Sequence, residues 1–327
     1  MVADLFLDVL APILLMVGVG AVMRWKFAID MGTLTKLNLY LFSPAFIFEK
    51  VATSNLQWAQ MGGIFVVSSV SILSAGLMII AGGILLARKG VSTSMQVALL
   101  VMFYNAGNYG VPLAELAFPA ESGRDGGASQ AFVIMAMNLL TFTVGSAMAS
   151  MSKANSKVNW RTVLRDVFKI PAIPALVAAL VCRWAFGPGS DWERPAIIFD
   201  TAKYLSAGLV PVALVTLGAQ LAVSPRWPKW KPISVILFLR LIYGPVHMAV
   251  LLWLFHLTGV PILNLWPWPA AVMVLTAGAP CAVNTLLLTI EMGGDARLAA
   301  DSVFWTTLLS AVTVLGWLVV IRAVMAG

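Results

Sequence analysis

Charged residues are scarce in this sequence. Asp, Glu, Lys and Arg make up only 11% of its 327 residues, whereas 60% are hydrophobic and the mean hydropathy is +0.92. Soluble domains carry about 25% charged residues, so this scarcity excludes a water-soluble fold and indicates an integral membrane protein. Several long segments have no charged residue at all, namely 51–87, 90–114, 126–152, 204–225 and 302–321.

The uncharged segments are long enough to cross a bilayer as helices, which need about 20 residues each. They are too long and too continuous for the strands of a membrane β-barrel, which alternate in face over about ten residues. The first segment has no small-residue cleavage pattern after it, so we expect a membrane helix there and not a signal peptide. The sequence predicts ten spans, at residues 5–24, 31–53, 60–87, 94–119, 127–151, 164–186, 196–222, 232–257, 268–290 and 299–323.

Cysteine and histidine are also rare, with two residues of each. Cys182 and Cys281 lie inside predicted spans, which argues against a disulfide framework. The cysteines and histidines lack the spacing of a metal site, and the sequence has no Gly-rich phosphate loop or zinc-protease motif. We therefore expect no metal, no cofactor and no enzymatic activity.

Lysine and arginine give the chain a net charge of +7. These residues are dispersed over short connections and not clustered on one soluble surface, which excludes nucleic-acid binding. In a ten-span protein most of them fall on one side of the membrane, and connections rich in Lys and Arg stay in the cytoplasm. We expect a multi-pass protein of the cell membrane, in a bacterial inner membrane, with both termini outside.

The two halves of the sequence show similar patterns in the same order. Residues 12–27 and 171–186 share a proline, an Arg-Trp pair and a phenylalanine at equal spacing. A repeat of five spans is odd-numbered, so its second copy must enter the membrane from the opposite side, and such inverted repeats are typical of secondary transporters. The predicted division is a first repeat at 1–151, a cytoplasmic linker at 152–163 and a second repeat at 164–327.

The fourth predicted span, 94–119, contains residues that interrupt helices. Gly107 and Gly110 tolerate backbone conformations that other residues resist, and Pro112 lacks an amide donor. Inside a membrane, irregular backbone survives only where protein covers it or where it lines a cavity. We expect the helix to unwind around residues 107–111, and we expect the second half-helix to direct its positive N-terminal end into the protein.

The ninth predicted span repeats this device, with Gly278 and Pro280 ahead of Asn284. Two broken helices that enter from opposite faces would cross near the middle of the membrane and form a cradle for an anion. Asn105, Asn108 and Asn284 supply amides that hold a carboxylate without a buried lysine. The alternative is that each Gly or Pro is only a packing kink, but paired interruptions in a repeat favour a binding site.

Five further residues are candidates for the transport path. Glu115 lies one turn after the interruption and is predicted to carry a coupling proton, with a simple position near the outer mouth as the alternative. Four polar residues are predicted to contact substrate. Structural roles explain these polar residues nearly as well: a hydrogen bond back to the backbone of a kinked helix, hydrogen bonds between helices, or the anchoring of a loop. These four are Ser43, Tyr109, Asn138 and Thr141.

Two stretches of the sequence are distinctive, YNAGNYGVPLAELAF (104–118) and APCAVNTLLLTIEMGGDARLAADSVFWTTLLS (279–310). They resemble the auxin efflux carrier family, which includes plant PIN-type auxin carriers and bacterial proteins described as malate or malonate permeases, and the resemblance covers nearly the whole chain. It implies a scaffold from spans 1, 2, 6 and 7, a mobile domain from spans 3–5 and 8–10, a homodimer and elevator-type alternating access. It also implies substrate contacts from Asn108, with Asn105 beside it, and from Asn284, and a crossing marked by the prolines Pro112 and Pro280.

Together these observations predict an all-α membrane protein with ten transmembrane helices, arranged as two inverted five-helix repeats with broken, crossing helices four and nine. The predicted function is export of small carboxylate anions, either auxin-like indole acids or malate- and malonate-type dicarboxylates. Membrane lipid and a second copy of the chain are the other expected partners. Two alternatives remain open from the sequence: a sodium-coupled organic anion importer that resembles the bile acid symporters, and a membrane sensor without transport.

Overall fold

The chain folds into helices in a computed structural model that describes residues 2–27, 29–120, 125–151, 170–187, 196–222 and 227–326. The predicted linker at 152–163 lies outside these residues. Over the described ranges, the one extended pairing is a single antiparallel bridge between Tyr104 and Cys281. The expected all-α membrane protein is confirmed, because six helices are long and apolar enough to cross a membrane: Val2–Lys26, Trp58–Leu85, Gly126–Ala149, Ala196–Leu221, Trp230–Leu257 and Ala296–Met325.

The first half of the chain consists of helices joined by short connections or by π-helical turns. Asp30 caps the helix at Met31 by accepting hydrogen bonds from the amides of Gly32 (3.1 Å) and Thr33 (3.0 Å), and Asp125 caps the helix at Gly126 by accepting from Ala128 (2.9 Å). The elements are α1 (Val2–Leu5), η1 (Phe6–Leu10), α2 (Ala11–Lys26), α3 (Met31–Leu37), η2 (Asn38–Phe42), α4 (Ser43–Thr53), α5 (Trp58–Leu85), α6 (Val91–Met102), α7 (Gly110–Ala117), α8 (Gly126–Leu140), η4 (Thr141–Gly145) and α9 (Ser146–Met151).

The second half of the chain also combines long and short helices, with one π-helical turn and one 3-10 turn among its described elements. Its elements are α11 (Ala172–Phe186), α12 (Ala196–Leu221), α13 (Trp230–Phe238), η5 (Leu239–Tyr243), α14 (Gly244–Leu257), the 3-10 turn η6 (Pro261–Leu263), α15 (Ala270–Ala277), α16 (Asn284–Glu291) and α17 (Ala296–Ala326). The predicted spans 94–119 and 268–290 are each divided into two short helices, α6 and α7 in the first half and α15 and α16 in the second.

Three of the long helices pass through a π-helical turn just before a proline. Pro12, Pro44 and Pro245 are each the second residue of the α-helix that follows η1, η2 or η5. A proline ring collides with the carbonyl four residues earlier, and that carbonyl lies inside the π-helical turn in all three cases. The wider turn accommodates the ring, so the helix continues across the proline and does not end there.

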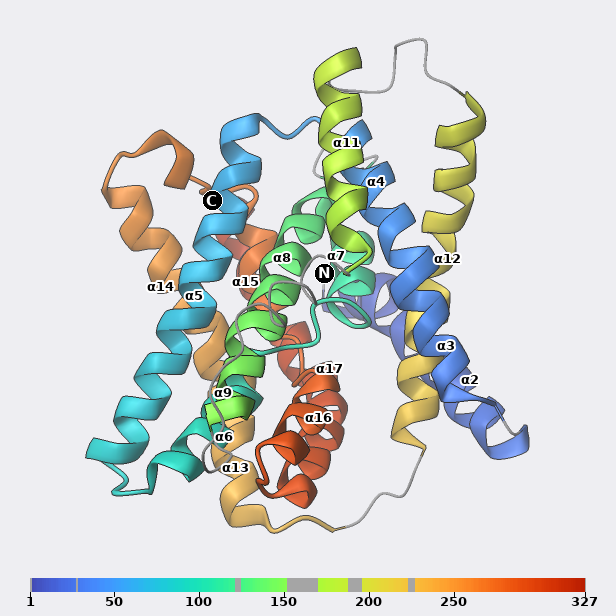
Figure 1. The fold of residues 1–327 in the computed structure, drawn as a ribbon. Helices are drawn as coiled ribbons and strands as arrows, with labels where there is room; N and C mark the ends of the chain where they lie inside the picture. The colour runs from blue at the N-terminus through green and yellow to red at the C-terminus, as the bar shows by residue number, and fades with distance from the viewer. Residues whose placement is uncertain are drawn as a thin grey trace.

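The helices form two groups in Figure 1. Helices α2, α4, α11 and α12 pack on one another at the right of the view, whereas α5, α6 and α13–α17 lie to the left and α8 runs between. Glycines bring α2 and α12 into backbone contact, because a Cβ at Gly20 would collide with the carbonyl of Val215 and a Cβ at Gly218 with that of Val17. Small residues permit this close approach between membrane helices.

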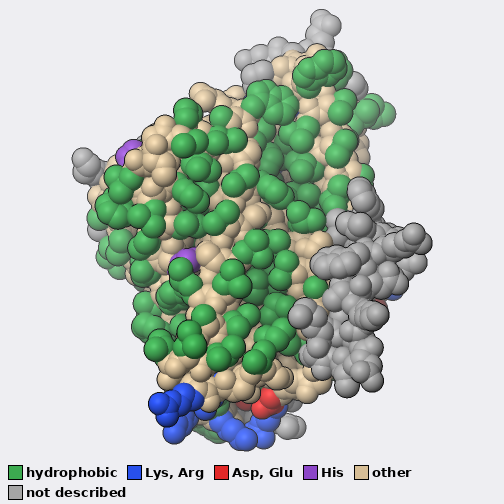
Figure 2. Space-filling model, turned by 60° about the vertical axis from the view of Figure 1, so that its left-hand side comes forward, with side chains coloured by type: hydrophobic (Ala, Val, Ile, Leu, Met, Phe, Trp, Pro, Cys, Tyr) green, Lys and Arg blue, Asp and Glu red, His purple; other side chains and the backbone are tan. Residues whose placement is uncertain are grey.

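The surface of the protein is apolar over most of one face. Figure 2 shows hydrophobic side chains covering the broad middle of this face, with lysine and arginine side chains gathered at its lower edge. Lysines lie at helix ends in this part of the chain, since Lys89 follows α5 and Lys231 lies at the beginning of α13. A broad apolar band with charges at its rim is the surface that a bilayer requires.

The two interruptions cross in the interior. The amide of Asn105 donates to the carbonyl of Pro280 (2.8 Å), and the amide of Ala282 donates to the carbonyl of Phe103 (3.1 Å). These bonds, on either side of the Tyr104–Cys281 bridge, pair backbone groups that neither helix can satisfy. Each broken helix therefore supplies the hydrogen-bond partners that the other lacks.

The first interruption differs in position from the expected 107–111. Helix α6 already ends at Met102, and α7 begins again at Gly110. Pro112 is thus the third residue of α7 and lies outside the irregular segment. In the first turn of a helix an amide has no intrahelical acceptor, so proline is accommodated there without breaking the helix.

Candidate functional site

A cavity of about 160 Å³ lies beside the crossing. Its walls come from both interruptions and from α3, η2, α4, α8, η4 and α12. None of the described residues that line it is Asp, Glu, Lys, Arg or His, so its polarity comes from amides and hydroxyls. The polar lining includes Thr35, Asn38, Ser43, Tyr104, Asn105, Asn108, Asn138, Thr141 and Asn284.

Six of the seven predicted substrate contacts meet in this cavity: Ser43, Asn105, Asn108, Asn138, Thr141 and Asn284. The seventh, Tyr109, is buried away from it. Its hydroxyl forms a hydrogen bond of 3.0 Å with Ser310 on α17. Tyr109 therefore ties the first interruption to α17, which corresponds to the loop-anchoring alternative.

Asn105, like Asn38, is a buried amide side chain of the cavity lining. It is only 7% exposed, and its Oδ1 accepts a hydrogen bond from the amide of Asn108 (3.0 Å). Its Nδ2 has no partner among the described residues. Buried donors are nearly always hydrogen-bonded, so an enclosed Nδ2 without a partner, on a residue that lines the cavity, is an unusual feature of this region.

The backbone amides at the beginning of α7 are less available than the sequence suggested. The amide of Gly110 donates to the carbonyl of Asn105 (2.9 Å), and the amide of Val111 donates to the carbonyl of Gly107 (3.2 Å). Pro112 has no amide hydrogen. The donors that the first interruption offers are therefore mainly side-chain amides, while the dipole of the short helix still favours negative charge at its N-terminal end.

Gln130 supports the first interruption from α8, and sequence reasoning did not identify it. This residue is fully buried, and its Nε2 donates to the carbonyl of Ala106 (2.8 Å). A Cβ at Gly110 would lie 2.6 Å from the same Nε2, so glycine is needed for the close approach. The one available signal was a lone glutamine in a span that is otherwise nearly apolar.

Arg240 lies on the opposite side of the crossing and is also new from the structure. It is 3% exposed and comes from the π-helical turn η5. Its guanidinium donates one hydrogen bond to the carbonyl of Val101, near the end of α6, and one to the carbonyl of Ala277, the last residue of α15. It also lies over the ring of Tyr104, 4.8 Å from the ring centre.

The contacts of Arg240 have a clear electrostatic cause. The last carbonyls of a helix have no intrahelical donor and carry partial negative charge. The one buried guanidinium of Arg240 therefore compensates the partial negative charge at the C-terminal ends of both α6 and α15. A charged residue inside an otherwise apolar span was the signal for a functional role, because ionisable residues in membranes are expensive and rarely face lipid.

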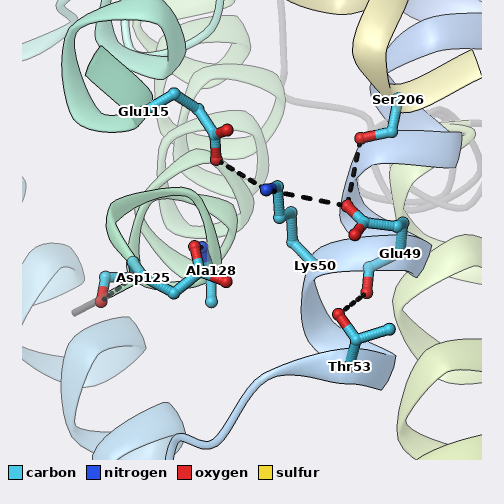
Figure 3. A network of polar contacts seen from close by, with 8 residues as sticks. Glu49, Lys50, Thr53, Glu115, Asp125, Ala128 and Ser206 are labelled. Carbon is cyan, nitrogen blue, oxygen red and sulfur yellow. Dashed lines mark hydrogen bonds and ion pairs between the residues drawn. The ribbon is translucent and has the colours of Figure 1, made fainter. Parts of the chain in front are cut away.

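Glu115 does not line the cavity at the crossing. Its carboxylate forms an ion pair of 3.0 Å with Lys50 on α4 (Figure 3). Lys50 also lies 3.9 Å from Glu49, and Glu49 in turn accepts a hydrogen bond from Ser206 on α12 (3.2 Å). This network connects α7 to α4 and α12.

A second, larger cavity of about 660 Å³ lies beside this network. Its lining includes Glu49 and Lys50 from α4, Asp125 at the beginning of α8, and Asp200 and Lys203 from α12. In contrast to the cavity at the crossing, it is lined by charges of both signs. Among the described residues, no group of three or more His, Cys, Asp or Glu is arranged to hold a metal ion.

Comparison with known proteins identifies the class of this molecule. A family model described as membrane transport protein matches residues 156–318. The chain belongs to this family of membrane transport proteins. The match, together with the relatives described next, confirms the predicted membership of the auxin efflux carrier family and assigns the chain to transporters and not to enzymes.

Three relatives are similar over much of their length. A protein of Rhizobium meliloti named "Putative malonate transporter" is 27% identical over 296 residues, which cover 90% of this chain and 88% of the relative. An uncharacterized transporter of Methanothermobacter thermautotrophicus is 23% identical over 294 residues, or 89% of each chain. Another uncharacterized transporter, from Methanocaldococcus jannaschii, is 26% identical over 224 residues, which cover 67% of this chain and 66% of the relative.

Proposed function

We propose that this transporter exports small carboxylate anions and binds the carboxylate in the cavity at the crossing. The observation that carries the proposal is the cluster of neutral amides, with the free donor of Asn105, at the interruption of two membrane helices. Paired interruptions are where secondary transporters bind substrate. The name of the Rhizobium meliloti relative supports a dicarboxylate of the malonate type.

The size and chemistry of the cavity favour a small acid. Its volume of about 160 Å³ is below the range of roughly 300–1,000 Å³ that suits drug-sized ligands, which argues for a short dicarboxylate over an aromatic indole acid. Asparagine amides donate to a carboxylate without adding charge. An uncharged site also releases its ligand more readily than a lysine would, because no buried cation is left unpaired.

We further propose an elevator mechanism in ten spans with both termini outside. The scaffold would consist of α1–α4, α11 and α12, and the mobile domain of α5–α9 and α13–α17, so that each inverted repeat contributes to both. The glycine contacts between α2 and α12 support a rigid scaffold. A homodimer through the scaffold would hold it still while the crossing and its ligand move.

The membrane potential is sufficient to drive export. With the inside negative by 100 mV, outward movement of one negative charge gains about 2.3 kcal/mol, which corresponds to a gradient of roughly fifty-fold. A coupled proton would add to this. Glu115 belongs to the proposed mobile domain and Lys50 to the scaffold, so movement separates the pair, and a proton on Glu115 would compensate for the lost partner.

Reconstitution into proteoliposomes tests this function. The purified protein should release preloaded malonate when the interior is made negative, and Asn105→Asp should abolish release, because it keeps the oxygen that accepts from Asn108 but replaces the free donor with a negative oxygen. Asn264→Asp, on an exposed connection, is the matched control and should release malonate normally. Failure to move any dicarboxylate or indole acid in either direction, or uptake that depends on sodium, would refute the proposal.

A further inference from the structure

An apolar groove lies at the surface of the protein between α5, α6 and α13. Its volume is about 810 Å³, much larger than the cavity at the crossing. Aliphatic side chains form most of its wall, among them Met78, Ile79, Val97, Val235 and Ile236. These helices lie at the lower left in Figure 1, on the side that Figure 2 brings forward.

The lower end of the groove is positively charged. Lys89, just after α5, and Lys231, at the beginning of α13, both line it and are exposed. None of the described residues in its lining is acidic. Figure 2 shows lysine and arginine side chains, with an acidic side chain among them, at the lower edge of the face that it draws.

Two helices begin at the same end, and neither has a side-chain cap. Gly90 precedes α6 and has no side chain, and Lys229 precedes α13 and has a side chain that cannot accept a hydrogen bond. The first amides of both helices therefore lack a side-chain acceptor at the cap position. The positive ends of α6 and α13 therefore add to the charge of the two lysines. Deeper in the groove, the hydroxyl of Ser94 is buried and has no partner in the described part of the chain.

We propose that this groove binds an anionic glycerophospholipid. One acyl chain lies along the aliphatic wall, and the phosphate lies at the lower end between Lys89 and Lys231. An apolar channel with a positive end matches a molecule that has a long hydrocarbon tail and a negative head. Lysines close to a membrane surface attract anionic lipid by about 1 kcal/mol each.

The position of the groove links the lipid to the crossing. Leu239 and Tyr243 line its inner wall, and both belong to the π-helical turn that carries Arg240. The groove also joins α6, which ends at the crossing, to α13 from the other half of the chain. A bound lipid therefore fills the space between two segments that hold the crossing together, and stabilises their packing.

Lipid binding to the detergent-purified protein, followed by native mass spectrometry and thermal unfolding, tests the proposal. Phosphatidylglycerol should bind and raise the melting temperature more than phosphatidylcholine with the same acyl chains. Lys89→Gln with Lys231→Gln should weaken phosphatidylglycerol binding by roughly 25-fold and leave phosphatidylcholine unchanged. The matched control, Lys26→Gln with Lys36→Gln, removes two exposed lysines outside the groove and should have no effect.

A second variant tests the apolar part of the groove. A Cβ at Gly82 meets nothing within 4 Å, so Gly82→Phe places a ring in the groove without a collision at its base, and binding should fall for both lipids. Gly316→Phe, at an equally open position on α17, is the control. Equal phosphatidylglycerol binding by the parent and the double lysine variant would overturn the proposal. Stabilisation by soluble glycerol phosphate as strong as by the lipid would overturn it too, because the groove would then not be used.

Discussion

The two sides of the helix crossing differ in how the polar groups at the ends of the broken helices are paired. On the C-terminal side, the free carbonyls of α6 and α15 are closed off by a buried cation, Arg240, which donates to both. On the N-terminal side, neutral amides line an open cavity and the Nδ2 of Asn105 has no partner among the described residues. We therefore propose that Arg240 stabilises the crossing and that the ligand binds on the opposite side, where the amides line the cavity.

Removal of the fixed charge should have the largest effect. Arg240→Met leaves two buried carbonyls without donors, and each costs about 1–3 kcal/mol, so the free energy of unfolding should fall by roughly 2–6 kcal/mol. It should also weaken malonate binding severalfold, because the positive charge near Tyr104 is lost. Thermal unfolding with and without malonate measures both effects.

Arg183→Met is the control for this prediction. Arg183 is also buried and donates to two carbonyls, those of Ser54 and Leu56, but far from the crossing. The control should lose similar stability and keep the malonate affinity of the parent. If both variants lose malonate affinity equally, the effect of Arg240 on the ligand is not due to its position at the crossing, and this prediction is wrong.

Replacement of an amide that lines the cavity should lower malonate affinity more than stability. Asn108→Ala removes a cavity amide without exposing a buried charge, so stability should change by less than about 1 kcal/mol, whereas malonate affinity should fall by about ten-fold or more. Isothermal titration and thermal unfolding on the same sample separate the two quantities. A variant with lower stability and unchanged affinity would place Asn108 in the fold and not in the site.

Replacement of Gln130 should lower both the stability and the malonate affinity, each by a smaller amount. Gln130→Met leaves the carbonyl of Ala106 without its donor and should cost about 1–3 kcal/mol, with a weaker affinity because the first interruption loosens. Gln96→Met is the matched control, since Gln96 bonds the backbone of Asp295 away from the cavity. The control should lose stability alone, and an affinity loss in it would show that any buried glutamine has this effect.

The ion pair of Lys50 and Glu115 should contribute least to stability. A double-mutant cycle of Lys50→Met and Glu115→Gln should give a coupling energy of about 1 kcal/mol or less, because both side chains are partly exposed. In proteoliposomes, Glu115→Gln should retain malonate exchange but lose any stimulation by an inward proton gradient. Stimulation that survives in the variant would remove Glu115 from proton coupling.

Much of the fold follows directly from the sequence. Charged residues are scarce and the apolar segments are long, and in a membrane such segments form helices because a helix pairs its own backbone hydrogen-bonding groups. The positions of the interruptions were less predictable. Residues 103–109 are irregular because Phe103 and Asn105 pair with the other broken helix, and Pro112 lies within α7 because the first turn tolerates proline.

Asn105, Asn108 and Asn284 could be predicted to lie near the crossing because asparagine beside a helix breaker is unusual in a membrane span, whereas Asn38 of the same cavity has no such neighbour and was not predicted. Arg240 was not predicted either, since its acceptors at Val101 and Ala277 lie 139 and 37 residues away in the sequence. For Tyr109 the sequence left loop anchoring open as the alternative to a substrate contact, because its partner Ser310 is 201 residues away and only the packed structure brings the two together. Local sequence chemistry thus indicates several residues of the cavity, whereas contacts between distant parts of the chain determine which residues support it.

The most direct test of the central claim is the rise in melting temperature that malonate causes in the parent and in Asn105→Asp. A ligand that binds only the folded protein raises its stability with concentration. Neutral amides at the crossing predict a concentration-dependent rise in the parent and in Asn264→Asp, and none in Asn105→Asp. An equal rise in all three proteins would contradict the account.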